Sequence, residues 1–223
     1  KDIDLIIVAT TTPDLTFPST AAIVQAKIGA PACAAFDLQA VCTGFIYAIS
    51  TAEKFLLCGQ HQRALVIGAE TFSRILDWND RTTCVLFGDG AGAFVLEARD
   101  AEYAGHRGII CSYLRCDGRL VDLLCVDGGV SSTMSTGHVR MQGNKVFREA
   151  VERIADAMES VARDSGISPR AIDWFVPHQA NARILDGIAK KLGVDPNKII
   201  MTLDKHGNTS AASIPLALNE AFE

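Results

Sequence analysis

An internal repeat is the sequence feature that most constrains how this chain folds. Residues 172–181, Ile-Asp-Trp-Phe-Val-Pro-His-Gln-Ala-Asn, repeat the pattern of residues 3–14, in which Ile-Asp precedes an apolar strand that ends in polar residues. A helix follows in both places and closes with Ala-Lys-Ile-Gly-Ala in the first copy and Lys-Lys-Leu-Gly-Val in the second. A repeat of this size predicts two related α/β halves whose strand-to-helix turns occupy corresponding positions.

We place the first half at residues 1–108 and the second at residues 109–223. A chain of 223 residues, 48% of them hydrophobic, can bury a substantial core. The nearly continuous apolar run at residues 3–9 predicts a strand buried on both faces. Because this strand begins almost at the first residue, we expect the sequence to be a piece of a longer protein.

The remaining periodicity predicts a conventional alternation of strands and helices. A glycine-rich stretch, residues 87–93, lacks the Gly-Lys-Ser/Thr ending of a phosphate-binding loop and precedes a strand, so it predicts a tight turn where backbone passes close to something. The other expected elements are helices at 21–28, 144–165 and from Thr43 to about Leu57, a strand at 63–69, β-like chain at 109–126 and a loop at 127–138.

Composition excludes some classes of function. The net charge is −5 and Lys and Arg form no run, which argues against a nucleic-acid surface. No apolar run is long enough to cross a bilayer and the first residues do not form a signal peptide, so we expect no membrane association and a cytoplasmic location. The seven cysteines include no Cys-x-x-Cys pair, which favours reduced thiols and no metal; for Cys111, Cys116 and Cys125, packing is favoured over metal binding.

Cys42 lies where an apolar strand becomes a helix. Residues 35–38 suit a short buried strand, and the apolar residues that follow recur with the spacing of one helical face. A thiol in the first turn of a helix faces free backbone N–H groups and the positive end of the helix dipole, which stabilise the thiolate. This placement predicts a nucleophile; the alternative is that Cys42 is one more small buried residue.

His178 and Asn208 stand at matching places in the second half, where apolar strands end. Sites in α/β sheets gather at the carboxyl ends of strands, so we expect Cys42, His178 and Asn208 to share one centre. Taken singly, His178 could be satisfied by a backbone carbonyl and Asn208 could be a helix cap.

Four motifs carry a resemblance to a known family. They are Asp-Leu-Gln-Ala-Val-Cys-Thr-Gly-Phe, Phe-Gly-Asp-Gly-Ala-Gly-Ala, Val-Pro-His-Gln-Ala-Asn-Ala-Arg and His-Gly-Asn-Thr-Ser-Ala-Ala-Ser-Ile-Pro. In this order they resemble β-ketoacyl-acyl carrier protein synthase III, the initiating condensing enzyme of fatty acid biosynthesis. The resemblance implies the thiolase fold, an α/β fold of two related halves in alternating helix and sheet layers, here apparently truncated at both ends, and a homodimer.

The resemblance also implies the chemistry, that of an acyltransferase of lipid metabolism. Cys42 would take an acyl group from acyl-CoA, and His178 and Asn208 would hold the thioester carbonyl of malonyl-acyl carrier protein while it loses CO₂. The resulting carbanion would attack acyl-Cys42 and give a 3-oxoacyl-acyl carrier protein. No cofactor is implied, because CoA and the phosphopantetheine of the carrier protein arrive as parts of the substrates.

Further positions match family residues near the substrates. Arg81 matches an arginine against the CoA adenine, Asn181 a residue near the pantetheine arm, and Arg183 a basic position used in carrier-protein docking. The tunnel and acyl pocket are matched by Gly143, Phe147 and Phe72, and Phe17 matches a ring that reaches into the other subunit's acyl pocket.

Three rival interpretations stay open. The first is an acyltransferase or condensing enzyme of the same fold in a specialised secondary pathway. The second is a cysteine hydrolase of the papain type, which also orders its residues Cys, His, Asn, but whose local cysteine signature is absent. The third is a non-catalytic interaction module, against which the intact Cys-His-Asn set argues.

Overall fold

The first half of the chain builds a four-stranded sheet. The structure, a computed structural model, describes residues 2–100, 102 and 107–222. The strands are β1 (Leu5–Ala9), β2 (Ala34–Leu38), β3 (Arg63–Thr71) and β4 (Asp89–Glu97), in the order β2-β1-β3-β4. The first three strands are parallel, with Leu5 paired to Ala34 and Ala64, and β4 runs antiparallel to β3. Parallel strands end at one edge, so β1, β2 and β3 deliver their carboxyl ends together.

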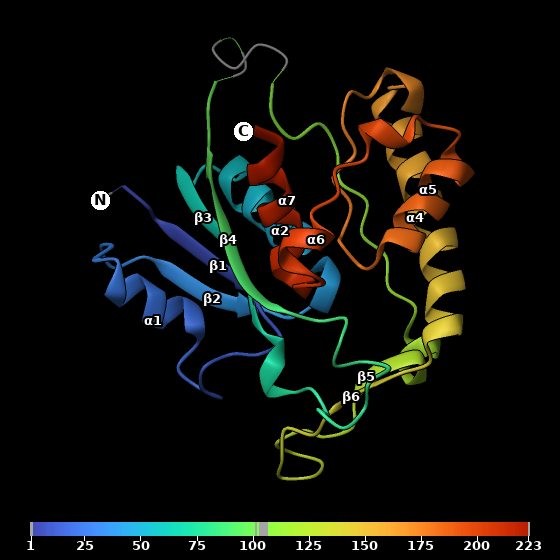
Figure 1. The fold of residues 1–223 in the computed structure, drawn as a ribbon. Helices are drawn as coiled ribbons and strands as arrows, with labels where there is room; N and C mark the ends of the chain where they lie inside the picture. The colour runs from blue at the N-terminus through green and yellow to red at the C-terminus, as the bar shows by residue number, and fades with distance from the viewer. Residues whose placement is uncertain (1, 101, 103–106, 223) are drawn as a thin grey trace.

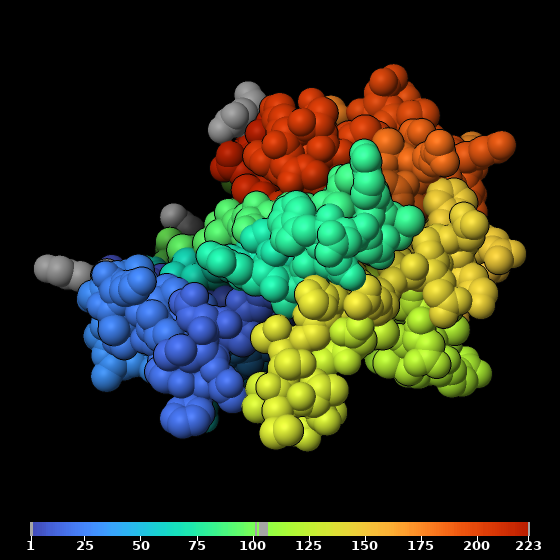
Figure 2. All heavy atoms as spheres, turned by 60° about the horizontal axis from the view of Figure 1, so that its bottom comes forward, coloured from blue at the N-terminus to red at the C-terminus, as the bar shows by residue number. Residues whose placement is uncertain are grey.

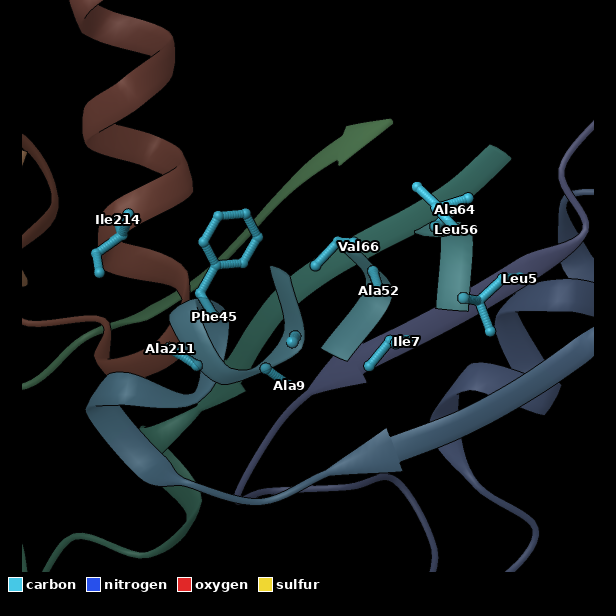
Figure 3. Packing of buried hydrophobic residues seen from close by; sticks show 11 residues of the cluster. Leu5, Ile7, Ala9, Phe45, Ala52, Leu56, Ala64, Val66, Ala211 and Ile214 are labelled. Carbon is cyan, nitrogen blue, oxygen red and sulfur yellow. The ribbon is translucent and has the colours of Figure 1, made fainter. Parts of the chain in front are cut away.

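Helices cover both faces of this sheet (Figure 1). Helix α1 (Thr20–Lys27) packs on one face, and α2 (Gly44–Leu57) and α7 (Ser213–Phe222) pack on the other. All five residues of β1 are buried, as the sequence predicted for a strand covered on both sides. Figure 3 shows the core under α2 and α7, where the fully buried Phe45 lies beside Val66 and Ile214. Each such side chain contributes roughly 1.5–3 kcal/mol to stability.

The second half is mainly helical. Long helix α4 (Gly143–Ser165) lies beside α5 (Ala182–Leu192), and their apolar faces enclose a second core that contains the buried Leu185 and Ile188 (Figure 1). Helix α6 (Leu203–His206) leads towards α7. Short 3-10 turns complete the chain: η1 (Val41–Thr43), η2 (Phe72–Arg74), η3 (Gly118–Leu123), η4 (Pro169–Ala171), η5 (Pro196–Lys198) and η6 (Ser210–Ala212). No helix among the described residues is both long and apolar enough to span a membrane.

The two strands expected in the second repeat are reduced to one parallel bridge. Phe175 pairs with Ile199, and the Phe175 N–H donates to the Lys198 carbonyl at 2.8 Å. The prediction of full strands there was wrong. Pro177, two residues after the bridge, lacks the N–H that a longer ladder would need.

The glycine-rich stretch is a strand and not the tight turn that we expected. Strand β4 begins at Asp89, so Gly90 and Gly92 lie inside it. A Cβ on Gly92 would lie 2.8 Å from Pro215, and one on Gly90 would lie 3.1 Å from Leu216. The expectation that backbone passes close to another segment is confirmed, because these glycines let α7 settle on the strand.

Residues 109–126 also differ from the β-like prediction. Only β5 (Leu124–Val126) is extended, paired with β6 (Val139–Met141), and η3 precedes it. Asp117 caps η3 by accepting the Arg119 N–H, a local side-chain bond that competes with strand pairing. The loop predicted at 127–138 is confirmed, and Figures 1 and 2 show the chain between β5 and β6 standing out from the body.

Turns η1 and η6 meet at the carboxyl edge of the sheet. Turn η6 approaches β3 so closely that a Cβ on Gly68 would lie 2.3 Å from the Ala211 carbonyl oxygen. Each turn also carries a non-glycine residue in the left-handed region, Val41 with φ 47° and Ser210 with φ 50°. The two halves are therefore joined, backbone against backbone, where their strand-to-helix turns coincide.

We expect Gly68→Ala to lower the free energy of unfolding by about 3 kcal/mol, because the added methyl would have to push η6 away from β3. The measurement is urea unfolding at pH 7. Gly118→Ala is the matched control, since a Cβ there meets nothing within 4 Å. Equal effects of the two substitutions would contradict the tight contact.

Candidate active site

Cys42 occupies turn η1, directly before α2. The preceding residue, Val41, has φ 47°, and a β-branched residue in this region is strained. The backbone N–H of Cys42 turns towards its own sulfur. The turn thus presents the thiol at the edge of the sheet, as the sequence predicted for a strand-to-helix junction.

The electrostatic surroundings of the thiol differ from the expectation. Burial, with a smaller contribution from the carboxylate of Glu70, raises the pKa of Cys42 to about 11, although a Ser210 hydrogen bond and the residue's own N–H act in the opposite direction. We expected the start of the helix to stabilise the thiolate. In this structure burial outweighs that effect, so the thiol needs a partner that takes its proton.

Asn208 is buried and its amide is held in one orientation. Its Oδ1 accepts the Ser210 N–H at 3.0 Å, and its Nδ2 lies 3.5 Å from the Ala180 carbonyl oxygen. The oxygen is therefore fixed on the Ser210 N–H, and the NH₂ group lies at the other end of the amide. Because a primary amide carries two N–H donors, one is left to donate into the adjoining cavity.

His178 is held by Ser213, the first residue of α7. Its Nδ1 lies 2.7 Å from the Ser213 Oγ, which also accepts the Gln179 N–H. Burial lowers the pKa of His178 to about 4, and the Ser210 backbone opposes this shift. The ring is neutral at pH 7, and when Ser213 donates to Nδ1 the ring proton sits on Nε2.

One large cavity brings these three side chains together. It has a volume of about 1670 Å³, and Cys42, His178 and Asn208 all line it. The residues predicted around the substrates that also line it are Gly143, Phe147, Asn181 and Arg183. Asn181 caps α5 by accepting the Ile184 N–H through Oδ1, which leaves its amide N–H groups as the donors towards the cavity.

Three other predicted positions lie outside the cavity lining. Arg81 is exposed, next to the lining residue Thr82. Phe72 is buried behind the wall and stacks at 4.8 Å on Phe87, which lines the cavity. Phe17 is 83% exposed and points its ring to solvent.

Sequence reasoning missed three polar residues that organise the site: Glu70, Ser210 and Ser213. Glu70 is 3% exposed and lies near the end of β3, where it accepts the Ser210 hydroxyl at 3.0 Å. A carboxylate at the carboxyl end of a buried strand was a signal that could have pointed to it. Among the described residues no His, Cys, Asp and Glu side chains are grouped as metal ligands, and all seven cysteines are free.

Comparison with known proteins identifies the family. The sequence model of the 3-oxoacyl-[acyl-carrier-protein] synthase III family matches residues 36–118, and the family model of its C-terminal part matches residues 162–223. A beta-ketoacyl-[acyl-carrier-protein] synthase III of Rhodospirillum centenum is 58% identical over 221 residues, covering 99% of this chain and 68% of that protein. One from Sphingopyxis alaskensis is 60% identical over 220 residues, with 99% and 68% covered. The chain belongs to the 3-oxoacyl-[acyl-carrier-protein] synthase III family.

Solved structures agree with this assignment to the synthase III family. The 3-oxoacyl-[acyl-carrier-protein] synthase III of Aquifex aeolicus superimposes with a TM-score of 0.92 at 43% identity, covering 99% of this chain and 68% of that one. The priming β-ketosynthase of the R1128 polyketide pathway gives 0.90 at 33% identity, with 99% and 66% covered. The resemblance inferred from the four motifs and the thiolase-type α/β fold are confirmed.

The lowered pKa of His178 predicts how stability depends on pH. Between its ordinary value of 6.5 and the folded value of about 4, the unfolded state binds more protons, so stability falls as pH falls through this window. In His178→Gln, which has no proton to gain, we expect this loss between pH 7 and pH 4.5 to shrink by about 2 kcal/mol. Urea unfolding at both pH values measures it, and equal losses in the two proteins would contradict a buried neutral ring.

Proposed function

We propose that this chain condenses an acyl-CoA primer with malonyl-acyl carrier protein through an acyl-Cys42 intermediate and forms a 3-oxoacyl-acyl carrier protein. Membership of the synthase III family gives the reaction class, a condensation of fatty acid biosynthesis. The observation that supports the residue roles is the cavity in which one nucleophile faces two neutral hydrogen-bond donors.

In the first step Cys42 attacks the acyl-CoA carbonyl and CoA leaves as a thiol. The strained turn at Val41 presents Cys42 to the cavity, where an acyl-pantetheine arm can reach it. Asn181 is suited to hold that arm, because its free amide N–H groups can donate to a pantetheine carbonyl. The exposed Arg81 and Arg183 are proposed to meet the CoA adenine and the acidic carrier protein, respectively.

In the second step malonyl loses CO₂ and negative charge collects on its thioester oxygen. Two fixed donors stabilise this enolate where it develops: the Asn208 amide and the Nε2–H of His178. Neutrality of His178 at pH 7 suits this role, since the ring donates without having to give up its proton. The carbanion then attacks the acyl-Cys42 thioester, and Cys42 leaves as thiolate.

A role in a specialised pathway remains the second candidate, because the priming β-ketosynthase of the R1128 polyketide pathway shares the fold at 33% identity. The two candidates differ in the acyl group that is taken up. Mass spectrometry of Cys42 after incubation of the full-length protein with a panel of acyl-CoA thioesters would separate them.

Assembly and location are part of the same proposal. The ring of Phe17, 83% exposed, is suited to enter the acyl pocket of a second copy, which supports a homodimer. We propose that no cofactor takes part beyond the substrate-borne CoA and phosphopantetheine. The cytoplasmic location stays a prediction from sequence.

The three site residues should separate the two half-reactions. We expect Cys42→Ala to abolish acyl-enzyme formation, because the nucleophile is gone. His178→Ala and Asn208→Ala should keep acylation but slow CO₂ release from malonyl-acyl carrier protein by about 100-fold or more, since each removes one enolate donor. Acyl uptake is measured by mass spectrometry and decarboxylation by labelled CO₂; equal loss of both steps in all three variants would contradict these roles.

Ser213 should act as a positioning residue for His178. In Ser213→Ala the ring loses its Nδ1 partner, and we expect CO₂ release to slow by about 10-fold while acylation of Cys42 is unchanged, because the substitution disturbs one donor only indirectly. The ¹⁵N chemical shifts of His178 report the tautomer directly. An unchanged tautomer together with an unchanged rate would contradict this role.

A further inference from the structure

Glu70 is a buried carboxylate that the reaction as described does not use. It lies at the carboxyl end of β3, 3% exposed, and both its own charge and its partner Ser210 act on Cys42. Its Oε1 accepts the Ser210 hydroxyl at 3.0 Å, and the turn that holds Ser210 packs against the turn that holds Cys42, where the Ser210 side chain acts to lower the pKa of the thiol. Sulfur, hydroxyl and carboxylate thus lie one after another.

The rest of the Glu70 pocket is neutral. Its Oε2 accepts the Thr11 N–H at 3.1 Å and the Thr12 hydroxyl at 2.8 Å, and the Ala211 backbone also donates to the carboxylate. Among the residues that the structure describes, the groups that act on Glu70 are hydroxyls, backbone amides and the Cys42 thiol, with no cation among them. A carboxylate with such surroundings has no ion pair to lose when it binds a proton.

The other titratable group of the site is a poor proton acceptor. Burial lowers the pKa of His178 to about 4, so its ring holds an extra proton weakly. Burial has the opposite effect on Glu70, whose pKa it raises above the ordinary value despite the donors around it. Of these two groups, Glu70 has the higher proton affinity and is therefore the better acceptor for the proton of a thiol.

We propose that Glu70, acting through the hydroxyl of Ser210, accepts the proton that Cys42 releases when it attacks its acyl donor. This inference rests on the proposed acylation of Cys42. The S–H bond breaks and its proton passes to Ser210 Oγ, while the Ser210 proton passes to Glu70. The thiolate forms the new S–C bond, the S–C bond to CoA breaks, and the proton returns along the same path to the departing sulfur, so that Glu70 is a carboxylate again.

A purely electrostatic role for Glu70 predicts the opposite sign. The negative charge disfavours the Cys42 thiolate, so if charge were its whole effect, Glu70→Gln would make the thiol more reactive at neutral pH. If Glu70 accepts the proton, the same substitution makes the thiol less reactive. The direction of the change therefore decides between the two roles.

The test uses the full-length protein and two reactions of Cys42. Alkylation by iodoacetamide, followed at the Cys42 peptide by mass spectrometry, reports thiol reactivity without any acyl donor, and the release of CoA from acetyl-CoA in a single turnover reports acylation. Both rates are measured from pH 6 to pH 10. The variants are Glu70→Gln and Ser210→Ala; the second keeps Glu70 but removes the connecting hydroxyl, and it serves as the test if the first fails to fold.

We expect both variants to be slower than wild type by about 100-fold at pH 7, the lower range for a positioned proton acceptor, and the difference to close towards pH 10 as hydroxide takes over. Thr12→Val is the matched control, because it removes a hydrogen bond to Glu70 without touching the path to Cys42. Because the lost bond lowers the pKa of Glu70, the pH profile of this control should move to higher pH, but its rates at pH 7 should fall far less than those of Glu70→Gln and Ser210→Ala.

Faster alkylation in Glu70→Gln, or a wild-type pH profile in Ser210→Ala, would overturn the proposal. An equal slowing in Thr12→Val would also overturn it, because general damage to the pocket would then suffice. If the variants slow alkylation as expected but wild type takes no acyl group from acetyl-CoA, the proton path stands and the proposed acylation by acetyl-CoA fails.

Discussion

The approach of turn η6 to strand β3 is the contact on which the site depends. The Ala211 carbonyl oxygen occupies the space that a side chain at residue 68 would take, and Gly90 and Gly92 make the same allowance for α7. Because these glycines have no side chain, the second half of the chain can pack directly against the sheet of the first half. Turn η6 meets the Cys42 turn there, and Asn208 and His178 line the same cavity as Cys42, so packing and the arrangement of the site share one cause.

Burial then sets the charge state of each group at this junction. It keeps His178 neutral at pH 7, which suits the proposed enolate donor, and it keeps Cys42 protonated, whereas the proposed nucleophile must lose its proton. The same burial that suits the decarboxylation step therefore opposes the acylation step. In the proposed mechanism Glu70, a second buried group whose pKa is raised, offsets this conflict by accepting the thiol proton through Ser210.

Local sequence patterns predicted much of the fold and of the site. Contacts between residues that are distant in the sequence account for the features that these patterns missed. The Cys42 turn, the long helix ending at Gly166 and the strand at 3–9 follow from periodicity and capping within a few residues. Residues 89–93 extend because they pair with residues 67–71 of β3, and Pro215 and Leu216, more than a hundred positions away, leave no room for larger side chains at Gly90 and Gly92. The position of Glu70 at a strand end could have marked it as a candidate, but its partner Ser210 is 140 residues distant and no local pattern predicts that pairing. The β-like reading of 109–117 failed because nothing pairs with that segment among the described residues, and pairing is what makes a strand.

The two asparagines of the cavity show why capping and catalysis need not be rival explanations. Asn181 and Asn208 each use Oδ1 to accept a backbone N–H at the start of a helical segment, from Ile184 and Ser210. An amide oxygen held in this way fixes the opposite end of the group, so the NH₂ can only be a donor towards the cavity. An unheld amide could flip and present its oxygen, which would repel an enolate. The bond to the backbone is thus what orients each amide as a donor, and the helix cap made by Asn181 is compatible with the role proposed for its NH₂ group.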